Sequence, residues 1–153
     1  MSTLDSDVRG VIVPCPSCGK ANRLAFARLD GRARCGHCHV DLHAPSVPVA
    51  VATTAAFDAM VGHSQLPVLV DFWAAWCGPC RAVAPQIEIV ARRNAGRLLV
   101  AKVDTEAVSD LAGRLGIRSI PTLAVYAGGR EAARTAGAMA ADGIEAFVRQ
   151  ALG

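Results

Sequence analysis

The sequence predicts an α/β fold, a mixed central sheet flanked by helices, with a small cysteine-rich segment in front of it. From about residue 49 onward, short apolar runs alternate with segments of helical periodicity, which is typical of a sheet covered by helices. Four of the six cysteines lie in the first 46 of the 153 residues, in two Cys-x-x-Cys pairs. Hydrophobic residues make up 52% of the chain and charged residues 19%, so a packed core is expected and a disordered chain is excluded.

A short proline-containing stretch, A-P-S-V-P at residues 44–48, divides the chain. We expect a cysteine-rich unit over residues 1–46 and an α/β domain over residues 47–153. The first unit has few large apolar side chains, and a unit of this size normally needs a metal or disulfides in order to fold. Its expected core consists of Leu24, Phe26, Leu29 and Leu42.

The α/β domain is expected to begin with a strand, followed by a helix, a second strand and a longer helix. Thr53 or Thr54 can cap a helix that runs through Val61, because a threonine side chain accepts a hydrogen bond from an amide of the first turn. Residues 68–73 form an apolar run with one interruption, as expected for a buried central strand. From Cys80 onward, apolar residues recur at helical spacing while charged residues fall on the other side. The apolar positions are Val83, Ile87, Val90 and Ala91.

The remaining elements complete the sheet and its covering helices. Residues 98–103 predict a strand, and residues 107–115 predict a helix. Residues 122–126 and 131–136 predict two strands that a Gly-Gly hairpin turn joins. The last helix has an apolar side formed by Ile144, Phe147, Val148 and Ala151.

Charge and hydropathy exclude several classes of function. The formal net charge of +3 is too small to indicate a nucleic-acid or membrane partner by bulk electrostatics. The longest apolar stretches fall short of the roughly 18 to 20 residues of a transmembrane helix. The amino-terminal residues contain no apolar run of the kind found in signal peptides, so we expect a cytoplasmic protein. In that reducing compartment, paired cysteines are metal ligands or redox-active dithiols more often than permanent disulfides.

The third cysteine pair occurs as W-C-G-P-C at residues 76–80, between the central strand and the amphipathic helix. Unpaired amides and the positive end of the helix dipole stabilise a thiolate at the first turn of a helix. Cys77 is therefore the expected nucleophile. Cys80, one turn into the helix, is the expected resolving thiol that attacks the mixed disulfide. Pro79 is tolerated because an amide so early in a helix has no intrahelical partner.

Residues 49–153 resemble a thioredoxin along their whole length, and the similarity extends beyond this motif. Asp71 lies where thioredoxins have a buried carboxylate, and Lys102 where they have the lysine beside it. The resemblance implies that Asp71 transfers protons to and from Cys80, although a purely structural carboxylate is the alternative. Further matches are Pro85 in the active-site helix, the cis-proline loop at Ile120-Pro121 and the groove glycine at Gly137. Substrate contacts are therefore expected at Trp76, Gly78, Pro79, Ile120, Pro121 and Gly137.

The other two cysteine pairs have the spacing of a four-cysteine zinc site. Cys15 and Cys18 are separated from Cys35 and Cys38 by 16 residues. Four thiolates leave no open position, so the expected Zn²⁺ is structural and not catalytic. The alternatives are a second redox pair at C-G-H-C, haem attachment at C-G-H-C-H and two disulfides without metal. A histidine could also replace one cysteine as ligand; the candidates are His37, His39 and His43.

A four-cysteine ribbon followed by a thioredoxin domain is similar to the zinc-containing bacterial thioredoxins of the thioredoxin 2 type. Ribbons of this kind also bind nucleic acids, but Phe26 is the only Phe, Tyr or Trp in the first 46 residues, which provides poorly for base stacking. The resemblance implies a protein-disulfide reductase that acts as a dithiol electron carrier. It also implies disulfide-containing protein substrates and a thioredoxin reductase that supplies electrons from NADPH.

Two alternative functions remain open. The pair could carry electrons in the other direction, as a disulfide oxidase or isomerase, although Gly-Pro between the cysteines matches the reducing thioredoxins better than the Gly-His of isomerases. The ribbon could also be a zinc-dependent docking or redox-sensing module, which is compatible with a reductase. We expect a monomer that binds no nucleic acid and no membrane.

Overall fold

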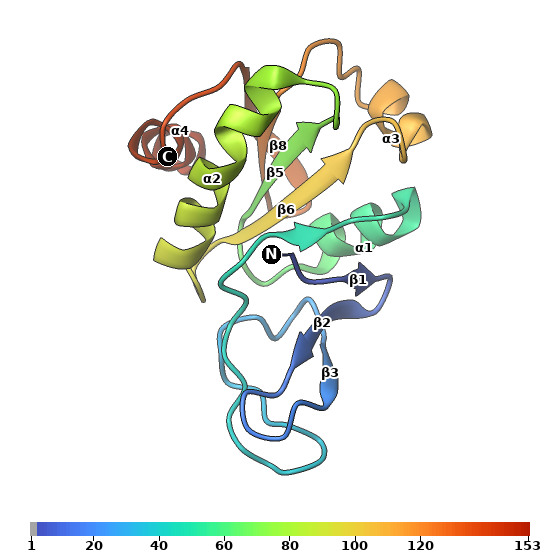
Figure 1. Ribbon diagram of the computed structural model, residues 1–153, viewed down its shortest axis with the longest axis vertical. Helices are drawn as coiled ribbons and strands as arrows, with labels where there is room; N and C mark the ends of the chain where they lie inside the picture. The colour runs from blue at the N-terminus through green and yellow to red at the C-terminus, as the bar shows by residue number, and fades with distance from the viewer. Residues whose placement is uncertain (1–2) are drawn as a thin grey trace.

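The computed structural model describes residues 3–153 and contains a five-stranded mixed sheet with helices on both faces (Figure 1). The strand order is β4-β6-β5-β7-β8. The first three strands are parallel, and β7 and β8 form a hairpin in which β7 runs antiparallel to β5. The strands are β4 (Val49–Ala50), β5 (Val68–Trp73), β6 (Leu99–Asp104), β7 (Thr122–Ala127) and β8 (Arg130–Ala136).

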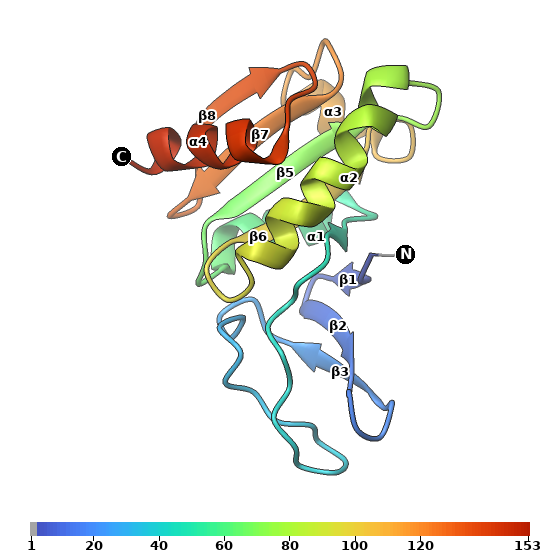
Figure 2. The ribbon, with the colours of Figure 1, turned by 60° about the vertical axis from the view of Figure 1, so that its left-hand side comes forward.

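Two helices cover each face of this sheet. The helices are α1 (Thr54–His63), α2 (Gly78–Arg93), α3 (Ser109–Arg114) and α4 (Ala141–Leu152). Helices α2 and α4 lie side by side on one face (Figure 2), where they pack against Leu69 and Val100. Helices α1 and α3 lie on the other face against Val70 and Phe72. Alternate residues of β5 therefore serve the two cores, as strand geometry requires.

The predicted elements of the α/β domain are confirmed, with ends displaced by a few residues. Thr53 caps α1 by accepting a hydrogen bond from the Ala56 amide at 3.1 Å. The largest differences are at the helix expected over 107–115, which shortens to α3, and at α2, which begins before Cys80. The Gly-Gly turn has positive φ at both residues, 61° and 81°, and this is the backbone of the tight hairpin turn that only glycine adopts easily.

The cysteine-rich segment contains a three-stranded antiparallel sheet that was not predicted from the sequence. Its strands are β1 (Ser6–Asp7), β2 (Gly10–Pro14) and β3 (Ala21–Leu24). Strands this short carry too little alternation for a periodicity argument. The predicted core of this segment is confirmed, because Leu24, Phe26, Leu29 and Leu42 are at most 3% exposed.

The cysteine-rich segment packs directly on the α/β domain, a relation that the sequence left open. Buried side chains of both parts form one continuous apolar cluster. Leu4 pairs in parallel with Val49, so the segment covers the outer edge of β4. The Gln65 side chain accepts a hydrogen bond from the Leu29 amide at 3.0 Å and donates one to Asp30 at 3.1 Å. These contacts fix the position of the segment against the end of α1.

Candidate functional site

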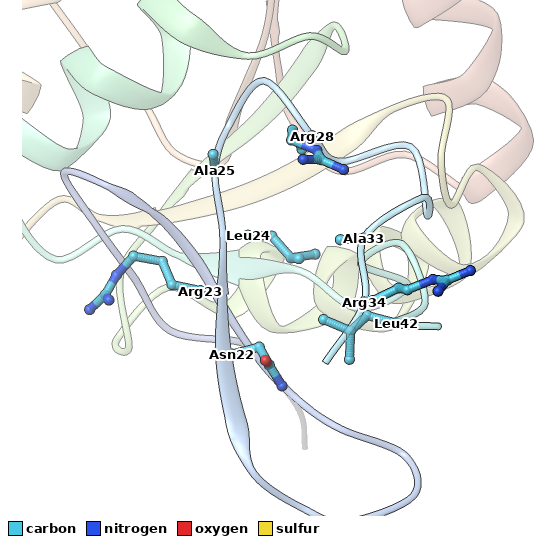
Figure 3. A pocket seen from close by; sticks show the side chains of 8 residues that line it. All are labelled: Asn22, Arg23, Leu24, Ala25, Arg28, Ala33, Arg34 and Leu42. Carbon is cyan, nitrogen blue, oxygen red and sulfur yellow. The ribbon is translucent and has the colours of Figure 1, made fainter. Parts of the chain in front are cut away.

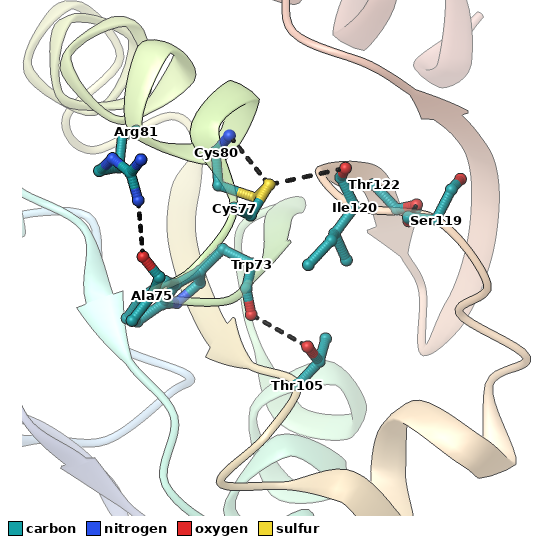
Figure 4. Close-up of a disulfide and its surroundings, with 9 residues drawn as sticks. All are labelled: Trp73, Ala75, Cys77, Cys80, Arg81, Thr105, Ser119, Ile120 and Thr122. Atoms are coloured by element: carbon teal, nitrogen blue, oxygen red, sulfur yellow. Dashed lines mark hydrogen bonds between the residues drawn. A yellow bond between two sulfur atoms is a disulfide. The ribbon is translucent and has the colours of Figure 1, made fainter.

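Cys77 and Cys80 form a disulfide where the carboxyl end of β5 leads into α2 (Figure 4). Cys77 is the N-cap residue of α2, and its Sγ accepts a hydrogen bond from the Cys80 amide at 3.1 Å. Both cysteines are almost buried, at 3% and 4% exposure, so a partner reaches the sulfur of Cys77 at the protein surface only through a small opening. The structure thus brings the two predicted redox cysteines together in the predicted setting.

The predicted substrate residues surround this disulfide. The peptide bond between Ile120 and Pro121 is cis, and the Ile120 carbonyl oxygen lies 3.7 Å from Cys77 Sγ. The Gly137 amide donates to the Pro121 carbonyl at 2.9 Å, which places the start of the 137–140 loop beside the proline. Trp76, next to Cys77 in the chain, is 69% exposed. The exposed indole, the proline loop and the glycine therefore border one surface around the sulfur.

Asp71 lies in β5 on the α2 side of the sheet and is fully buried. Neither carboxylate oxygen has a hydrogen-bond partner among residues 3–153. Burial raises the pKa of this carboxyl from 3.8 to about 6, and the charge of Lys102 opposes the rise. Lys102 is opposite Asp71 in the β5–β6 register. Its Nζ lies 4.9 Å from the centre of the Trp73 ring, in a cation–π contact.

A small cavity of about 100 Å³ lies beside Lys102 and Trp73. Its lining includes Cys80, Lys102 and Trp73. Cys80 and Lys102 therefore share one cavity, and it is large enough for water molecules.

The four amino-terminal cysteines converge on one point, as predicted. Their Sγ atoms all lie within 4.8 Å of one another. The Sγ–Sγ distances are 3.5 Å for Cys15 and Cys38 and 3.7 Å for Cys18 and Cys35. A tetrahedron whose corners lie about 2.3 Å from a central zinc ion has edges of about 3.8 Å. The cluster thus has the donors and the size of a tetrahedral metal site.

Backbone amides point at these sulfurs in two similar turns. Cys15 Sγ accepts from the Ser17 and Cys18 amides, and Cys35 Sγ accepts from the His37 and Cys38 amides, all at 3.3–3.5 Å. The Cys38 amide is the main reason that the pKa of Cys35 falls to about 5, and the Cys18 amide lowers the pKa of Cys15. The two turns thus favour the thiolate form of Cys15 and Cys35, the form that binds a metal, whereas the pKa of Cys18 is raised to about 11.

The family models divide the chain in the same way as its structure. The model described as thioredoxin matches residues 48–150, about two thirds of the chain. The chain belongs to the thioredoxin family. A second model, described as the amino-terminal part of thioredoxin 2, matches residues 14–40, which include all four cysteines of the cluster.

Individual thioredoxins match over much of their length. The chain is 38% identical to thioredoxin C-3 of Corynebacterium nephridii over 142 residues, which are 93% of this chain and 96% of that protein. It is 46% identical to thioredoxin 1 of Nostoc sp. over 90 residues, 59% of this chain and 84% of the relative. A solved structure of a mutant thioredoxin from Halobacterium salinarum has a TM-score of 0.64 and 29% identity, covering 71% of this chain and 94% of the other.

Membership of this family makes the chain a thiol-disulfide oxidoreductase, a dithiol reductase of protein disulfides. Thioredoxins in general act on disulfide substrates and accept electrons from a thioredoxin reductase. The four-cysteine cluster adds a metal-binding site to this thioredoxin fold. Among the described residues, no helix combines the length and apolar character that a membrane crossing needs.

Two contacts of this thioredoxin site were not predicted from the sequence. Arg81 Nη1 donates to the Ala75 carbonyl at 2.8 Å and braces the loop that precedes Cys77 (Figure 4). Thr105 donates to the Trp73 carbonyl from both its amide, at 2.8 Å, and its hydroxyl, at 3.1 Å. Both acceptors are backbone carbonyls, and no residue pattern in a single sequence indicates such partners.

Proposed function

We propose that Cys77 is the nucleophile of the reductase and Cys80 the resolving thiol. The Cys77 thiolate attacks one sulfur of a substrate disulfide, forms a mixed disulfide with it and releases the other sulfur as a thiolate that takes up a proton. Cys80 then loses its proton and attacks Cys77 Sγ, which releases the second substrate thiolate. Two electrons pass to the substrate, and the Cys77–Cys80 disulfide remains. The observation that carries this proposal is the hydrogen bond from the Cys80 amide to Cys77 Sγ, because the same amide stabilises a Cys77 thiolate.

Asp71 is the proposed base for Cys80. A carboxyl with a pKa of about 6 is mostly ionised at neutral pH and still basic enough to accept a proton from a thiol during attack. The cavity shared by Cys80 and Lys102 offers the path. Lys102 favours the ionised form of Asp71 by its charge, and the Trp73 ring holds the ammonium group in place.

The surface around Cys77 is the proposed substrate groove. Its floor and walls are formed by Trp76, Gly78, Pro79, Ile120, Pro121 and Gly137. An extended substrate segment can lie between the exposed indole and the proline loop, since this loop lies within 4 Å of the reacting sulfur. None of these six side chains is charged, which suits a reductase that accepts many protein substrates.

We propose that a thioredoxin reductase using NADPH restores the dithiol, and that the chain works as a reductant and not as an oxidase or isomerase. The Gly-Pro dipeptide between the cysteines supports this direction. The reduction potential tests it: we expect a value near about −270 mV, and a value above about −180 mV would indicate an oxidant or isomerase.

The cluster of four cysteines is the proposed site of one structural Zn²⁺, held by Cys15, Cys18, Cys35 and Cys38. When bound, the ion would cross-link a segment that has few large apolar side chains to form a core of its own. We place the boundary of this zinc ribbon at residues 1–46 and that of the thioredoxin domain at 47–153. A metal and thiol count checks the assignment: reduced protein should hold one zinc and two free thiols, and mildly oxidised protein one zinc and none. Zinc lost together with the first two thiols would support the redox-sensing alternative.

We further propose that the protein acts as a cytoplasmic monomer. Four metal-binding thiolates persist only where disulfides do not form spontaneously, which favours a reducing compartment. The β4 edge of the sheet is already paired with the segment around Leu4, so this edge offers no site for a second copy. Sedimentation in solution and cell fractionation test the two statements separately.

Replacing Cys77 or Cys80 separates their proposed roles. Cys77→Ser should abolish turnover of a protein disulfide in a reductase-coupled assay. Cys80→Ser should still attack the substrate once but then accumulate the mixed disulfide, which mass spectrometry detects at Cys77. Turnover retained by Cys77→Ser, or a mixed disulfide found at position 80 in that variant, would overturn the assignment.

A further inference from the structure

The ribbon carries a groove that the disulfide chemistry does not use. It has a volume of about 300 Å³ and lies between β3 and the chain around residues 33–34 and 42 (Figure 3). The apolar part of the lining consists of Leu24 and Leu42, which are buried, and of Ala25 and Ala33, which are exposed and half-buried. The rim carries three arginines, namely Arg23, Arg28 and Arg34.

The three arginines differ in whether an acidic side chain already binds their guanidinium group. Arg23 binds Asp7 through two nitrogens, at 2.8 and 3.0 Å, so its guanidinium group is occupied. Arg34 makes one contact with Asp41 at 3.4 Å, and both side chains are strongly exposed, at 73% and 80%. Arg28 has no acidic partner among residues 3–153. An exposed single-contact pair contributes little and exchanges partners readily, so two guanidinium groups are available to a ligand.

The two available groups lie on the side of β3 that the groove occupies. Arg28 and Arg34 extend to one side of β3, whereas Arg23 extends to the other side (Figure 3). A guanidinium group binds carboxylates and phosphates through two parallel hydrogen bonds. The apolar part of the lining suits a ligand that alternates acidic and apolar groups, which is a property of a peptide. Base stacking has no support here, since Phe26 is buried and is the only Phe, Tyr or Trp of the ribbon.

We propose that this arginine groove, formed by Arg28, Arg34 and the apolar part of its lining, binds acidic segments of the proteins whose disulfides the chain reduces. Strand β3, which forms one wall of the groove, lies toward the opposite end of the molecule from the amino-terminal end of α2 (Figure 1), where Cys77 is the N-cap residue. A substrate with an acidic segment at a suitable distance can occupy the groove and the disulfide site together. Such two-point binding raises the effective concentration of its disulfide at Cys77. Small disulfides without acidic residues gain nothing from the groove.

A direct binding measurement tests the proposal without any electron transfer, so its outcome is independent of the proposed roles of Cys77 and Cys80. The probe is a fluorescein-labelled peptide of alternating Glu and Leu, titrated with the zinc-loaded protein and followed by anisotropy. The double variant Arg28→Gln/Arg34→Gln should weaken binding about tenfold, the loss expected for two exposed charge pairs. The matched control Arg92→Gln/Arg149→Gln removes the same charge from two exposed arginines that have no ion pair among the described residues, and should change the affinity less than about twofold.

Three further measurements decide the outcome. Binding of the peptide should weaken as salt concentration rises, and a Gln-Leu peptide of the same length should not bind. Zinc content and turnover of a small disulfide should be equal in the two double variants, which establishes that both are folded. The proposal is overturned if the peptide does not bind the parent protein, if the control double variant loses as much affinity, or if a single-stranded oligonucleotide binds the groove more tightly than the peptide.

Discussion

At the scale of one residue, the buried carboxyl of Asp71 makes the stability of the fold depend on pH. Its carboxyl is buried without a hydrogen-bond partner, and its pKa rises from 3.8 to about 6 on folding. Between these two pH values the unfolded chain has lost the proton and the folded chain keeps it. The free energy of unfolding therefore falls as the pH rises through this range, by about 3 kcal/mol in total.

Asp71→Asn removes this ionisation while keeping the shape of the side chain. We expect the variant to be more stable than the parent by up to about 3 kcal/mol at pH 7, with a difference that shrinks towards zero at pH 4. Denaturant unfolding of the oxidised protein across this pH range measures the difference. Asp58→Asn is the control of opposite sign, because Arg114 lowers the pKa of Asp58 and the substitution should destabilise the protein at pH 7. Equal stability of Asp71→Asn and parent at pH 7 would contradict the account.

The same residue should control the pH dependence of resolution. In the parent, the rate at which Cys80 resolves a mixed disulfide should rise with pH through about 6, as Asp71 loses its proton and becomes a base. In Asp71→Asn this rise should be absent and the rate at neutral pH lower, by about tenfold or more. Stopped-flow measurement with a labelled mixed disulfide at Cys77 separates this step from the first attack. A pH profile that is the same in both proteins would exclude Asp71 as the base.

His39 is the only described residue other than glycine with a positive φ, at 69°. It occupies the position in the second cysteine turn that Gly19 occupies in the first, where φ is 79°. A left-handed backbone costs about 1–2 kcal/mol for residues with a Cβ atom. His39→Gly should therefore stabilise the zinc-loaded protein by about 1 kcal/mol, measured by denaturant unfolding. His37→Gly, where φ is not positive, should have no such gain and should destabilise the ribbon; stabilisation by both substitutions would point to a cause other than φ.

At the scale of elements, Gln65 holds the ribbon to the end of α1. Gln65→Ala leaves the Leu29 amide without its acceptor and removes the bond to Asp30. We expect a loss of about 1–2 kcal/mol in the free energy of unfolding and faster hydrogen exchange at the Leu29 amide. Gln150→Ala, an exposed position on α4, is the matched control. If the Leu29 amide exchanges its hydrogen equally slowly in the two variants, Gln65 does not hold the ribbon to α1.

The helices and strands also differ in how well the sequence predicts them. Strand β5 and helix α2 were predictable because their apolar spacing is long enough to distinguish period 2 from period 3.6. Strands β1 and β3 were not, because two to four residues define no period. The six cysteines were predictable from spacing, and Asp71, Lys102, Pro121 and Gly137 only from resemblance to a family. The hydrogen bonds of Gln65 to Leu29 and Asp30 could not be predicted from the sequence. Nothing in a single sequence distinguishes this glutamine from any other, because only the fold brings its two partners beside it.

At the scale of the whole molecule, the two cysteine sites lie at opposite ends of one connected structure. The disulfide is at the amino-terminal end of α2, and the four-cysteine cluster includes Cys15 and Cys18 of the loop between β2 and β3. The start of α2 and the strands β2 and β3 lie toward opposite ends of the molecule (Figures 1 and 2). Between them, the buried residues of the ribbon and of the α1 face of the sheet form a single cluster. Loss of the metal should therefore lower the local stability of the thioredoxin domain through this cluster and through the β4 edge. The α2–α4 face of the sheet should be affected least.

Removal of zinc with a chelator tests the order in which these regions lose stability. The free energy of unfolding should fall by several kcal/mol, because a structural metal site contributes its binding energy to folding. Hydrogen exchange should accelerate first in β2 and β3, then at the Ala50 amide, which donates to the Leu4 carbonyl at 2.8 Å. The Ile144 amide of α4 serves as the internal reference and should stay protected.

Turnover of a small disulfide should persist in the metal-free protein, because none of the contacts around Cys77 involves the ribbon. If protection were lost equally at Ala50 and Ile144, the chain would unfold as one unit; if it were lost only in the ribbon, the continuous core would carry no coupling between the two sites.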